Sequence, residues 1–164
     1  MRKALILILL FVSVVAYGQR NPAAFHGSSH LGENPELINN GTFDDGSNWE
    51  MAAGWTITGG EAVYDDVDDY ETIYQVDANM AGSMEASTTY TLKFDVTSGG
   101  GTGVRFKVTT YPAGVGNLID AAYYTTDSYE VDVTTESSNY TGIRFYAYTD
   151  GDGGSIDNIS LKKK

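Results

Sequence analysis

The strongest constraint on the fold is a run of short β-type segments that begins near residue 36 and continues to the end of the chain. Each segment is rich in Val, Ile, Thr and Tyr and is bounded by Gly, Asp, Asn or Ser, which is typical of strands joined by turns. Beyond the N-terminal apolar run, no window has the apolar period of a helix. The expected strands span residues 37–39, 55–58, 61–64, 72–76, 90–97, 104–110, 129–133, 142–148 and 156–161. About nine short strands predict an all-β protein, an antiparallel β-sandwich of the jelly-roll type.

Alternation along three of these strands separates an apolar face from a polar one, because successive side chains point to opposite sides of a sheet. The polar faces of strands 90–97, 104–110 and 142–148 carry Lys93, Asp95, Arg105, Lys107, Arg144, Tyr146 and Tyr148. If the three strands share one sheet, these side chains form a single outer face. That face then holds a concentration of cations in an acidic protein.

This outer face has two interpretations. Aromatic rings stack on the C–H faces of sugar rings, while Arg, Lys and Asp bind hydroxyl or carboxylate groups, so the face suits a carbohydrate. Alternatively, it is an ordinary exposed sheet surface with ion pairs between strands, such as Lys93 or Arg105 with Asp95. The twelve tyrosines favour recognition, since Tyr is common at binding surfaces, although exposed strands also favour Tyr. Trp49 and Trp55 flank a loop, and each is expected either to line a binding cleft or to seal the core.

The N-terminus has the three parts of a secretory signal peptide, which we assign to residues 1–18. Arg2 and Lys3 precede an apolar run over residues 4–16, and small residues suited to cleavage follow. This run is shorter than the roughly 20 residues of a transmembrane helix, so we expect no membrane span once it is removed. Residues 19–35 lack periodicity and are assigned to a flexible leader before a single domain over residues 36–164. The expected location is secreted or at a cell surface, outside the cytoplasm.

Charge and cysteine content exclude several functions. Residues 1–18 carry two cations and no acid, so their removal takes the formal net charge from −12 to −14. Such a charge repels nucleic acid, which is therefore not an expected partner. The chain has no cysteine, which excludes disulfides, thiolate catalysis and cysteine-ligated zinc. Both histidines lie in the leader, away from any catalytic triad, and we predict that the protein is not an enzyme.

Four stretches occur in the order found in a known group of β-sandwiches. They are the opening LINNGTFDD (37–45), a Gly-Trp strand near residue 55, the strand TYTLKFDV (89–96) and the closing IDNISL (156–161). Together they resemble the galactose-binding-like jelly rolls of carbohydrate-binding modules, in the group that contains families 4, 9 and 22. The resemblance covers nearly all of residues 36–161 and implies a fold more specifically than a ligand. Similar domains also occur in bacterial surface proteins and in phage structural proteins.

The resemblance also implies a structural calcium ion between an acid near the opening stretch and the aspartate of the closing strand. Carried over to this chain, the implied ligands are Asp44, with Asp45 beside it, and Asp157. Strand parity places Asp157 on the side of Ile159 and Leu161, which we expect to face the core, where a carboxylate must be paired, hydrogen-bonded or metal-bound. The alternative is that Asp157 accepts backbone N–H bonds at the start of its strand.

The stretch TDGDGG (149–154) precedes that strand and begins like the calcium-binding loop of an EF-hand. The later positions of such a loop do not match, since Leu161 stands where the bidentate Glu is required. We therefore predict a Gly-rich hairpin at 149–154. The three lysines at 162–164 are expected to form a solvated end.

These patterns favour an exported, non-catalytic module that binds a polysaccharide or surface glycan. The residues assigned to the ligand are Tyr146, Tyr148, Arg144, Arg105, Lys107, Lys93, Asp95 and Trp55. Positive charge on this face suggests an acidic or sulfated glycan. The second hypothesis is a structural or adhesive subunit of a cell surface, fibre or virion, in which the same face meets a protein partner or another copy of the chain.

Overall fold

The computed structural model describes residues 34–65, 71–99, 104–110, 117–136, 141–148 and 153–164. The predicted signal peptide at 1–18, nearly all of the leader at 19–35 and residues 149–152 of the predicted hairpin lie outside these residues. Within the described part of the chain, no helix is long and apolar enough to cross a membrane.

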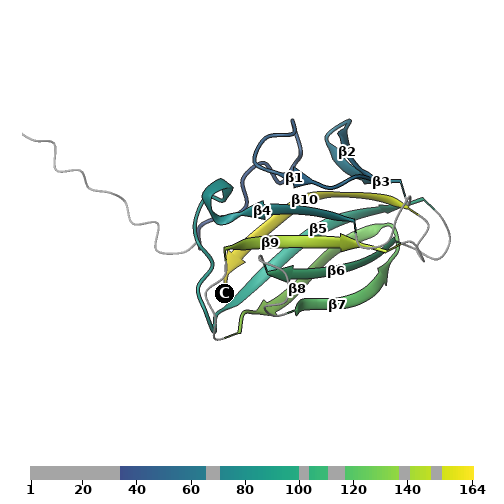
Figure 1. Ribbon diagram of the computed structural model, residues 1–164. Helices are drawn as coiled ribbons and strands as arrows, with labels where there is room; N and C mark the ends of the chain where they lie inside the picture. The colour runs from purple at the N-terminus through teal and green to yellow at the C-terminus, as the bar shows by residue number, and fades with distance from the viewer. Residues whose placement is uncertain (1–33, 66–70, 100–103, 111–116, 137–140, 149–152) are drawn as a thin grey trace, which may run out of the picture. The chain divides into compact units, whose positions relative to one another are not determined.

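Ten strands form two antiparallel five-stranded sheets, which confirms the predicted jelly-roll sandwich. The first sheet contains, in order, β1 (Glu50–Met51), β4 (Thr72–Val76), β9 (Gly142–Ala147), β6 (Val104–Thr110) and β7 (Asn117–Tyr124). The second contains β2 (Trp55–Thr58), β3 (Glu61–Tyr64), β10 (Gly154–Lys163), β5 (Thr89–Ser98) and β8 (Asp127–Thr134). Figure 1 shows β4, β9, β6 and β7 as one layer, with β10, β5 and β8 forming the layer behind it.

Eight of the nine predicted strands are present, and the differences lie at the sheet edges. The strand predicted at 37–39 is wrong, because the described chain around it forms only an isolated bridge, from Glu36 to Lys162. The structure adds β1 and β7, which were not predicted. β7 has the sequence NLIDAAYY, whose Asn, Asp and Ala are disfavoured in strands. It lies at a sheet edge, and its pairing with β6 is interrupted by register shifts.

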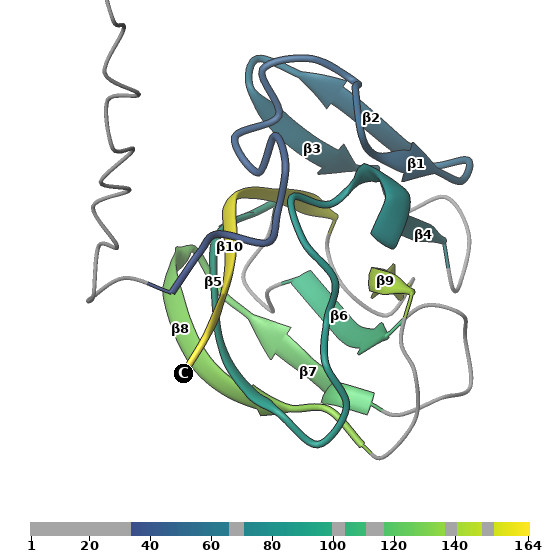
Figure 2. The ribbon, with the colours of Figure 1, turned by 90° about the vertical axis from the view of Figure 1, so that its left-hand side faces the viewer.

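The segment 36–41 covers the part of β10 that lies beyond its pairing with β3. Ile159 N–H donates to the carbonyl oxygen of Gly41 at 2.9 Å. On its other side the segment is held by Gln75 of β4, whose buried amide bonds both the N–H and the C=O of Asn39, at 3.0 and 2.8 Å. The segment therefore joins the two sheets at this edge, and Figure 2 shows it passing beside β10.

Both tryptophans belong to the core. Trp49 is 5% exposed and donates its Nε1–H to the carbonyl oxygen of Asn40 at 2.9 Å. Trp55 is 4% exposed, and its ring centre lies 5.5 Å from that of Tyr64 and 6.0 Å from that of Phe106 in the other sheet. The prediction that Trp55 contributes to ligand binding is wrong, because its side chain fills the space between the sheets.

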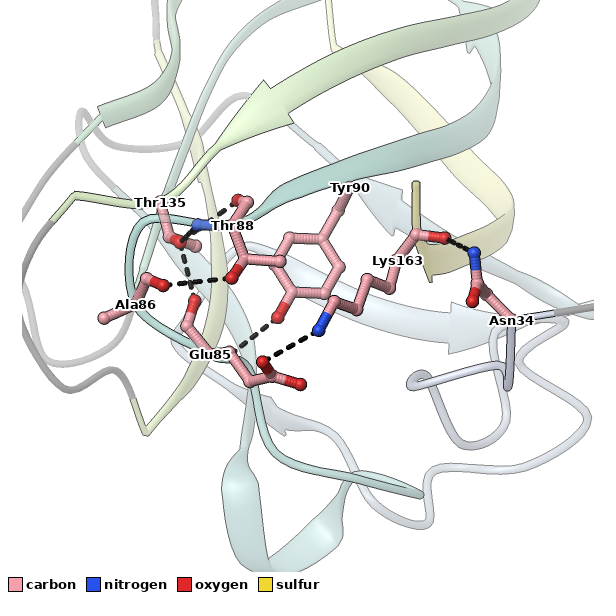
Figure 3. Close-up of polar contacts among 7 residues, drawn as sticks. All are labelled: Asn34, Glu85, Ala86, Thr88, Tyr90, Thr135 and Lys163. Carbon is pink, nitrogen blue, oxygen red and sulfur yellow. Dashed lines mark hydrogen bonds and ion pairs between the residues drawn. The ribbon is translucent and has the colours of Figure 1, made fainter.

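The C-terminal lysines are part of the fold, since β10 extends to Lys163, while the Lys163 and Lys164 side chains remain 43% and 60% exposed to solvent. Figure 3 shows Lys163 held from two sides: its Nζ pairs with the Glu85 carboxylate at 2.8 Å, and its carbonyl oxygen accepts a hydrogen bond from Asn34. Glu85 in turn donates its N–H to the Tyr90 hydroxyl at 2.6 Å and accepts the Thr135 hydroxyl on its carbonyl oxygen at 2.6 Å. This network ties the end of β10 to the beginning of β5 and the end of β8.

Candidate functional site

The structure divides the predicted outer face between two sheets. Five of its seven residues lie on or just after the neighbouring strands β6 and β9 of the first sheet: Arg105, Lys107, Arg144, Tyr146 and Tyr148. The other two, Lys93 and Asp95, lie on β5 in the second sheet. The condition for a single outer face, that the three strands share one sheet, is therefore not met. Alternation assigned the two faces of each strand but contained no information on which strands pair.

We call the outer surface of the first sheet the Tyr–Arg face. Its members are Tyr74, Arg105, Lys107, Tyr123, Arg144, Tyr146 and Tyr148. Their neighbours along the strands, such as Ile73, Phe106 and Phe145, are buried in the core, so the members point away from it. Because β4, β9, β6 and β7 are adjacent, the Tyr–Arg face extends over about 14 Å across the strands.

One cluster on this face is built around Arg144 of β9. Its guanidinium carbon lies 5.0 Å from the centre of the Tyr74 ring and 5.5 Å from that of the Tyr146 ring. Its Nη1 also donates a hydrogen bond to the Tyr146 hydroxyl at 2.9 Å. The Tyr74 hydroxyl donates to Glu50 Oε2 of β1 at 2.6 Å. Cation–π and hydrogen-bond contacts therefore fix the orientation of two tyrosine rings around one guanidinium.

A second cluster is built around Arg105 of β6. Its guanidinium carbon lies 4.8 Å from the centre of the Tyr148 ring and 5.6 Å from that of Tyr123, which is 45% exposed. Lys107 lies between the two clusters, since it follows Arg105 on the same side of β6 and pairs with Tyr146 of β9. The face thus has partly exposed aromatic rings and three cations on rigid central strands.

Tyr74 and Tyr123 complete the clusters and were not among the predicted site residues. Tyr74 had a usable signal, because in the strand TIYQV it alternates with the apolar Ile73. Tyr123 had none, since β7 was not predicted. Its position opposite Arg105 depends on the pairing of β7 with β6.

Lys93 and Asp95 take part in cross-strand contacts on the outer surface of the second sheet. Lys93 Nζ pairs with Glu130 of β8 at 2.8 Å, and Asp95 Oδ2 accepts a hydrogen bond from Asn158 at 2.7 Å. Exposed pairs of this kind contribute about 0–1 kcal/mol to stability. The second sheet therefore matches the alternative of an ordinary exposed surface, although Lys93 pairs with Glu130 and not with Asp95.

Asp157 faces outward, so the prediction that it points toward the core is wrong. It pairs directly with Asp95, and paired residues share one side of a sheet. A β-bulge follows, because the register shifts between Asp157 and Ser160 and Asn158 has a φ of 50°. Because of this extra residue, the Ile159 side chain is buried in the core although Asp157, two residues earlier, lies on the outer side of the sheet.

The surroundings of Asp157 fit a bound cation in part. Its Oδ1 is buried and has no hydrogen-bond partner in the structure. Burial raises the pKa of Asp157 first of all, and the charges of Glu61, Asp95 and Asp44 raise it further, against the lowering effect of the Asn158 N–H. Calcium takes six to eight oxygen ligands, of which backbone carbonyls can supply several. Among the described residues, however, no three acidic or histidine side chains are close enough together to hold one ion.

The other two predicted ligands differ in their surroundings. Asp44 is one of the charges that act on Asp157. Asp45 is exposed, and its Oδ1 accepts the Ser47 N–H at 2.7 Å and the Asn40 amide at 3.1 Å. Hydrogen bonding by the Ser47 side chain, and then by its N–H, lowers the pKa of Asp45, and these contacts give Asp45 a role in the local turn. Of the three predicted ligands, Asp45 is thus engaged in its own turn, whereas Asp157 has an unpartnered oxygen and the Asp44 charge nearby.

Comparison with known proteins supports the fold. No family model matches the sequence, and no curated protein matches it. A solved family 4 carbohydrate-binding module superposes with a TM-score of 0.54 and 18% identity, over 77% of this chain and 99% of that one. The N-terminal cellulose-binding domain of Cellulomonas fimi β-1,4-glucanase C gives 0.53 and 20%, over 79% and 98%. A family 61 module in complex with β-1,4-galactotriose gives 0.51 and 14%, over 79% and 99%. The chain therefore has the β-sandwich jelly-roll fold of carbohydrate-binding modules.

Proposed function

We propose that the protein is an exported, non-catalytic carbohydrate-binding module whose Tyr–Arg face binds a polysaccharide or surface glycan. The observation that carries the proposal is the arrangement of four tyrosines around two arginines on the outer surface of one sheet. The shared fold with carbohydrate-binding modules supports it. Export is supported by the signal-peptide pattern of residues 1–18.

The chemistry of the face explains how such binding works. A tyrosine ring offers an apolar surface to the C–H side of a sugar ring and a hydroxyl to its rim. The arginines hold the rings in place and supply N–H donors to sugar oxygens. Since the side chains are already ordered by contacts with each other, little side-chain entropy is lost when the ligand binds.

Affinity gel electrophoresis against a panel of soluble glycans tests this proposal. Tyr146→Ala and Arg144→Ala are expected to reduce retardation by the bound glycan, each with a loss of affinity of about tenfold or more, as for central aromatic and arginine anchors. Lys93→Gln on β5 is the matched control, because it removes a cation from the opposite sheet. Unchanged retardation of both face variants would overturn the proposal.

The same residues also suit a protein interface, because Tyr and Arg are among the residues most enriched at interface hot spots. In that case the protein is a structural or adhesive subunit that uses the Tyr–Arg face for assembly. Size-exclusion chromatography with light scattering distinguishes the two functions. A concentration-independent oligomer that Tyr146→Ala dissociates favours assembly, whereas a monomer retarded by glycan favours carbohydrate binding.

A structural calcium ion near Asp157 forms part of the proposed function. The buried Oδ1 of Asp157 and the nearby charges of Glu61, Asp95 and Asp44 support it. When bound, the ion would neutralise these carboxylates and tie β10 to its neighbours. The site lies on the second sheet, so its expected effect is on stability and not on the Tyr–Arg face.

A further inference from the structure

The cations of the described chain are distributed unevenly between the two sheets. Of the ten lysines and arginines, three lie outside the described residues: Arg2, Lys3 and Arg20. Three of the other seven, Arg105, Lys107 and Arg144, lie on the Tyr–Arg face. The remaining four belong to β5, β10 and the residue that follows it. Three of those four are in ion pairs, with Glu130, Glu85 and Asp132.

Acidic side chains have the opposite distribution. On the outer surface of the second sheet lie Glu61, Asp95, Glu130, Asp132 and Asp157. Among the side chains described on the strands of the first sheet, the only acid is Glu50, at the β1 edge, which accepts the Tyr74 hydroxyl. The Tyr–Arg face is thus a local positive surface on a protein with a net charge of −12.

Lys107 is the central residue of this positive surface. It is partly buried, pairs with Tyr146 and lies two residues from Arg105 on the same side of β6. Its side chain makes no hydrogen bond or ion pair with any residue that the structure describes, although its backbone belongs to the β6–β9 ladder. Alternate residues of one strand lie about 6.6 Å apart and directly paired residues about 5 Å. Arg144 pairs with Thr109, two residues beyond Lys107, so Lys107 lies about 7–8 Å from each arginine while the two arginines lie about 14 Å apart. A negative group bound among them would relieve the repulsion between like charges.

From these observations we infer that the ligand of the Tyr–Arg face is an anionic polysaccharide, one that carries carboxylate or sulfate groups. The inference rests on the proposed function and adds the chemical class of the glycan. Tyrosine rings stack on sugar rings, the arginine forks match the two oxygens of a carboxylate or sulfate, and the Lys107 ammonium supplies a point charge between them. The acids of the second sheet lie on the opposite surface of the sandwich, about 10 Å or more away, so a group bound at the Tyr–Arg face is closer to its three cations than to these acids.

Paired glycans that differ only in charge test the inference. One pair is polygalacturonate and its methyl ester, which tests carboxylates, and the other is dextran sulfate and dextran, which tests sulfates. An array with further uronate-containing, sulfated and neutral chains covers other backbones. Affinity is measured for the wild type, Lys107→Gln, Tyr146→Ala and the control Lys93→Gln, with folding checked by circular dichroism. Loss of one charge-assisted contact corresponds to about a tenfold loss of affinity.

We expect wild type to bind charged chains at least tenfold more tightly than their neutral partners, Lys107→Gln to lose about tenfold on charged chains, and Lys93→Gln to match the wild type. Equal binding of charged and neutral chains, weakened by Tyr146→Ala, would overturn the anionic class while leaving the proposed function intact. Absence of binding to any glycan on the array would overturn both. Binding of single-stranded nucleic acid in place of anionic glycans would also overturn the inference, because it would assign the charges to phosphate.

Discussion

Asp157 lies directly across the β10–β5 ladder from Asp95, so two carboxylates share one side of the second sheet. Like charges placed opposite each other in a sheet are destabilising. Burial of Asp157 is the main reason that its pKa is raised, and the charges of Glu61, Asp95 and Asp44 add to the effect. This relationship determines how the stability of the protein should respond to pH and to calcium.

Asp157→Asn is expected to stabilise the protein at neutral pH in the presence of a chelator. A carboxyl whose folded-state pKa is raised binds its proton more tightly when folded, so its ionised form weakens the folded state above that pKa. The penalty is relieved as the pH falls through the raised pKa, and it is absent below the ordinary value of about 3.9. The gain in melting temperature over wild type should therefore shrink as the pH is lowered from 7 toward 4. A gain that grows toward low pH would contradict this explanation.

If Asp157 holds a calcium ion, adding calcium should make the wild type more stable than Asp157→Asn, the reverse of the order expected with a chelator. A ligand that binds only the folded state raises its stability in proportion to the logarithm of its concentration above the dissociation constant. Millimolar calcium should raise the melting temperature of the wild type and leave that of Asp157→Asn unchanged. Asp45→Asn is the matched variant, because the Asp45 carboxylate is engaged by Ser47 and should not affect the response to calcium. An equal calcium response in wild type and Asp157→Asn would remove Asp157 from the site.

Trp55→Ala is expected to destabilise the protein by about 3–5 kcal/mol, the usual loss when a large aromatic side chain is removed from a core. Trp55 is 4% exposed and packs on Tyr64 and Phe106. Its Nε1–H is buried with no hydrogen-bond partner, so Trp55→Phe removes an unsatisfied donor as well as volume and should cost less. Urea unfolding measures both changes. Glycan should retard Trp55→Phe as much as the wild type. A loss of retardation without a loss of stability would show that Trp55 contributes to glycan binding.

Gly41→Ala is expected to destabilise the protein, because the added Cβ would lie 2.0 Å from the carbonyl oxygen of Ile159. Moving the two backbones apart would also weaken the bond from Ile159 N–H to the Gly41 oxygen. Overpacking of this kind costs about 1–3 kcal/mol. Gly46→Ala is the matched control, since a Cβ there would meet no atom within 4 Å. Equal melting temperatures for the two variants would show that segment 36–41 does not depend on this close approach.

Tyr146→Phe separates the ring of Tyr146 from its hydroxyl. The substitution keeps the aromatic surface but removes the oxygen that accepts the Arg144 Nη1–H bond at 2.9 Å. A single hydrogen bond contributes about 0.5–1.5 kcal/mol, so affinity for the glycan should fall only a few-fold, far less than in Tyr146→Ala. Isothermal titration calorimetry with the best-bound glycan measures the difference. If Tyr146→Phe is as weak as Tyr146→Ala, the hydroxyl and not the ring makes the decisive contact.

The sequence alone determined the strand content and the two faces of most strands. Period-two alternation is a local property, so the outward positions of Arg105, Lys107, Arg144 and Tyr146 followed from their own strands. Order and spacing of the motifs were sufficient to predict a jelly-roll sandwich. Segments without alternation or good strand formers could not be predicted, and for this reason β7 and Tyr123 were missed.

Only the tertiary structure decided which strands are neighbours. Hydrogen bonds between strands join residues far apart in the chain. The sequence of a single strand therefore cannot show that β5 belongs to one sheet and β6 and β9 to the other. That assignment separated Lys93 and Asp95 from the Tyr–Arg face. The bulge after Asp157 has the same origin: one extra residue against β5 reverses the parity of the strand, which turns a carboxylate predicted to face the core out to the surface.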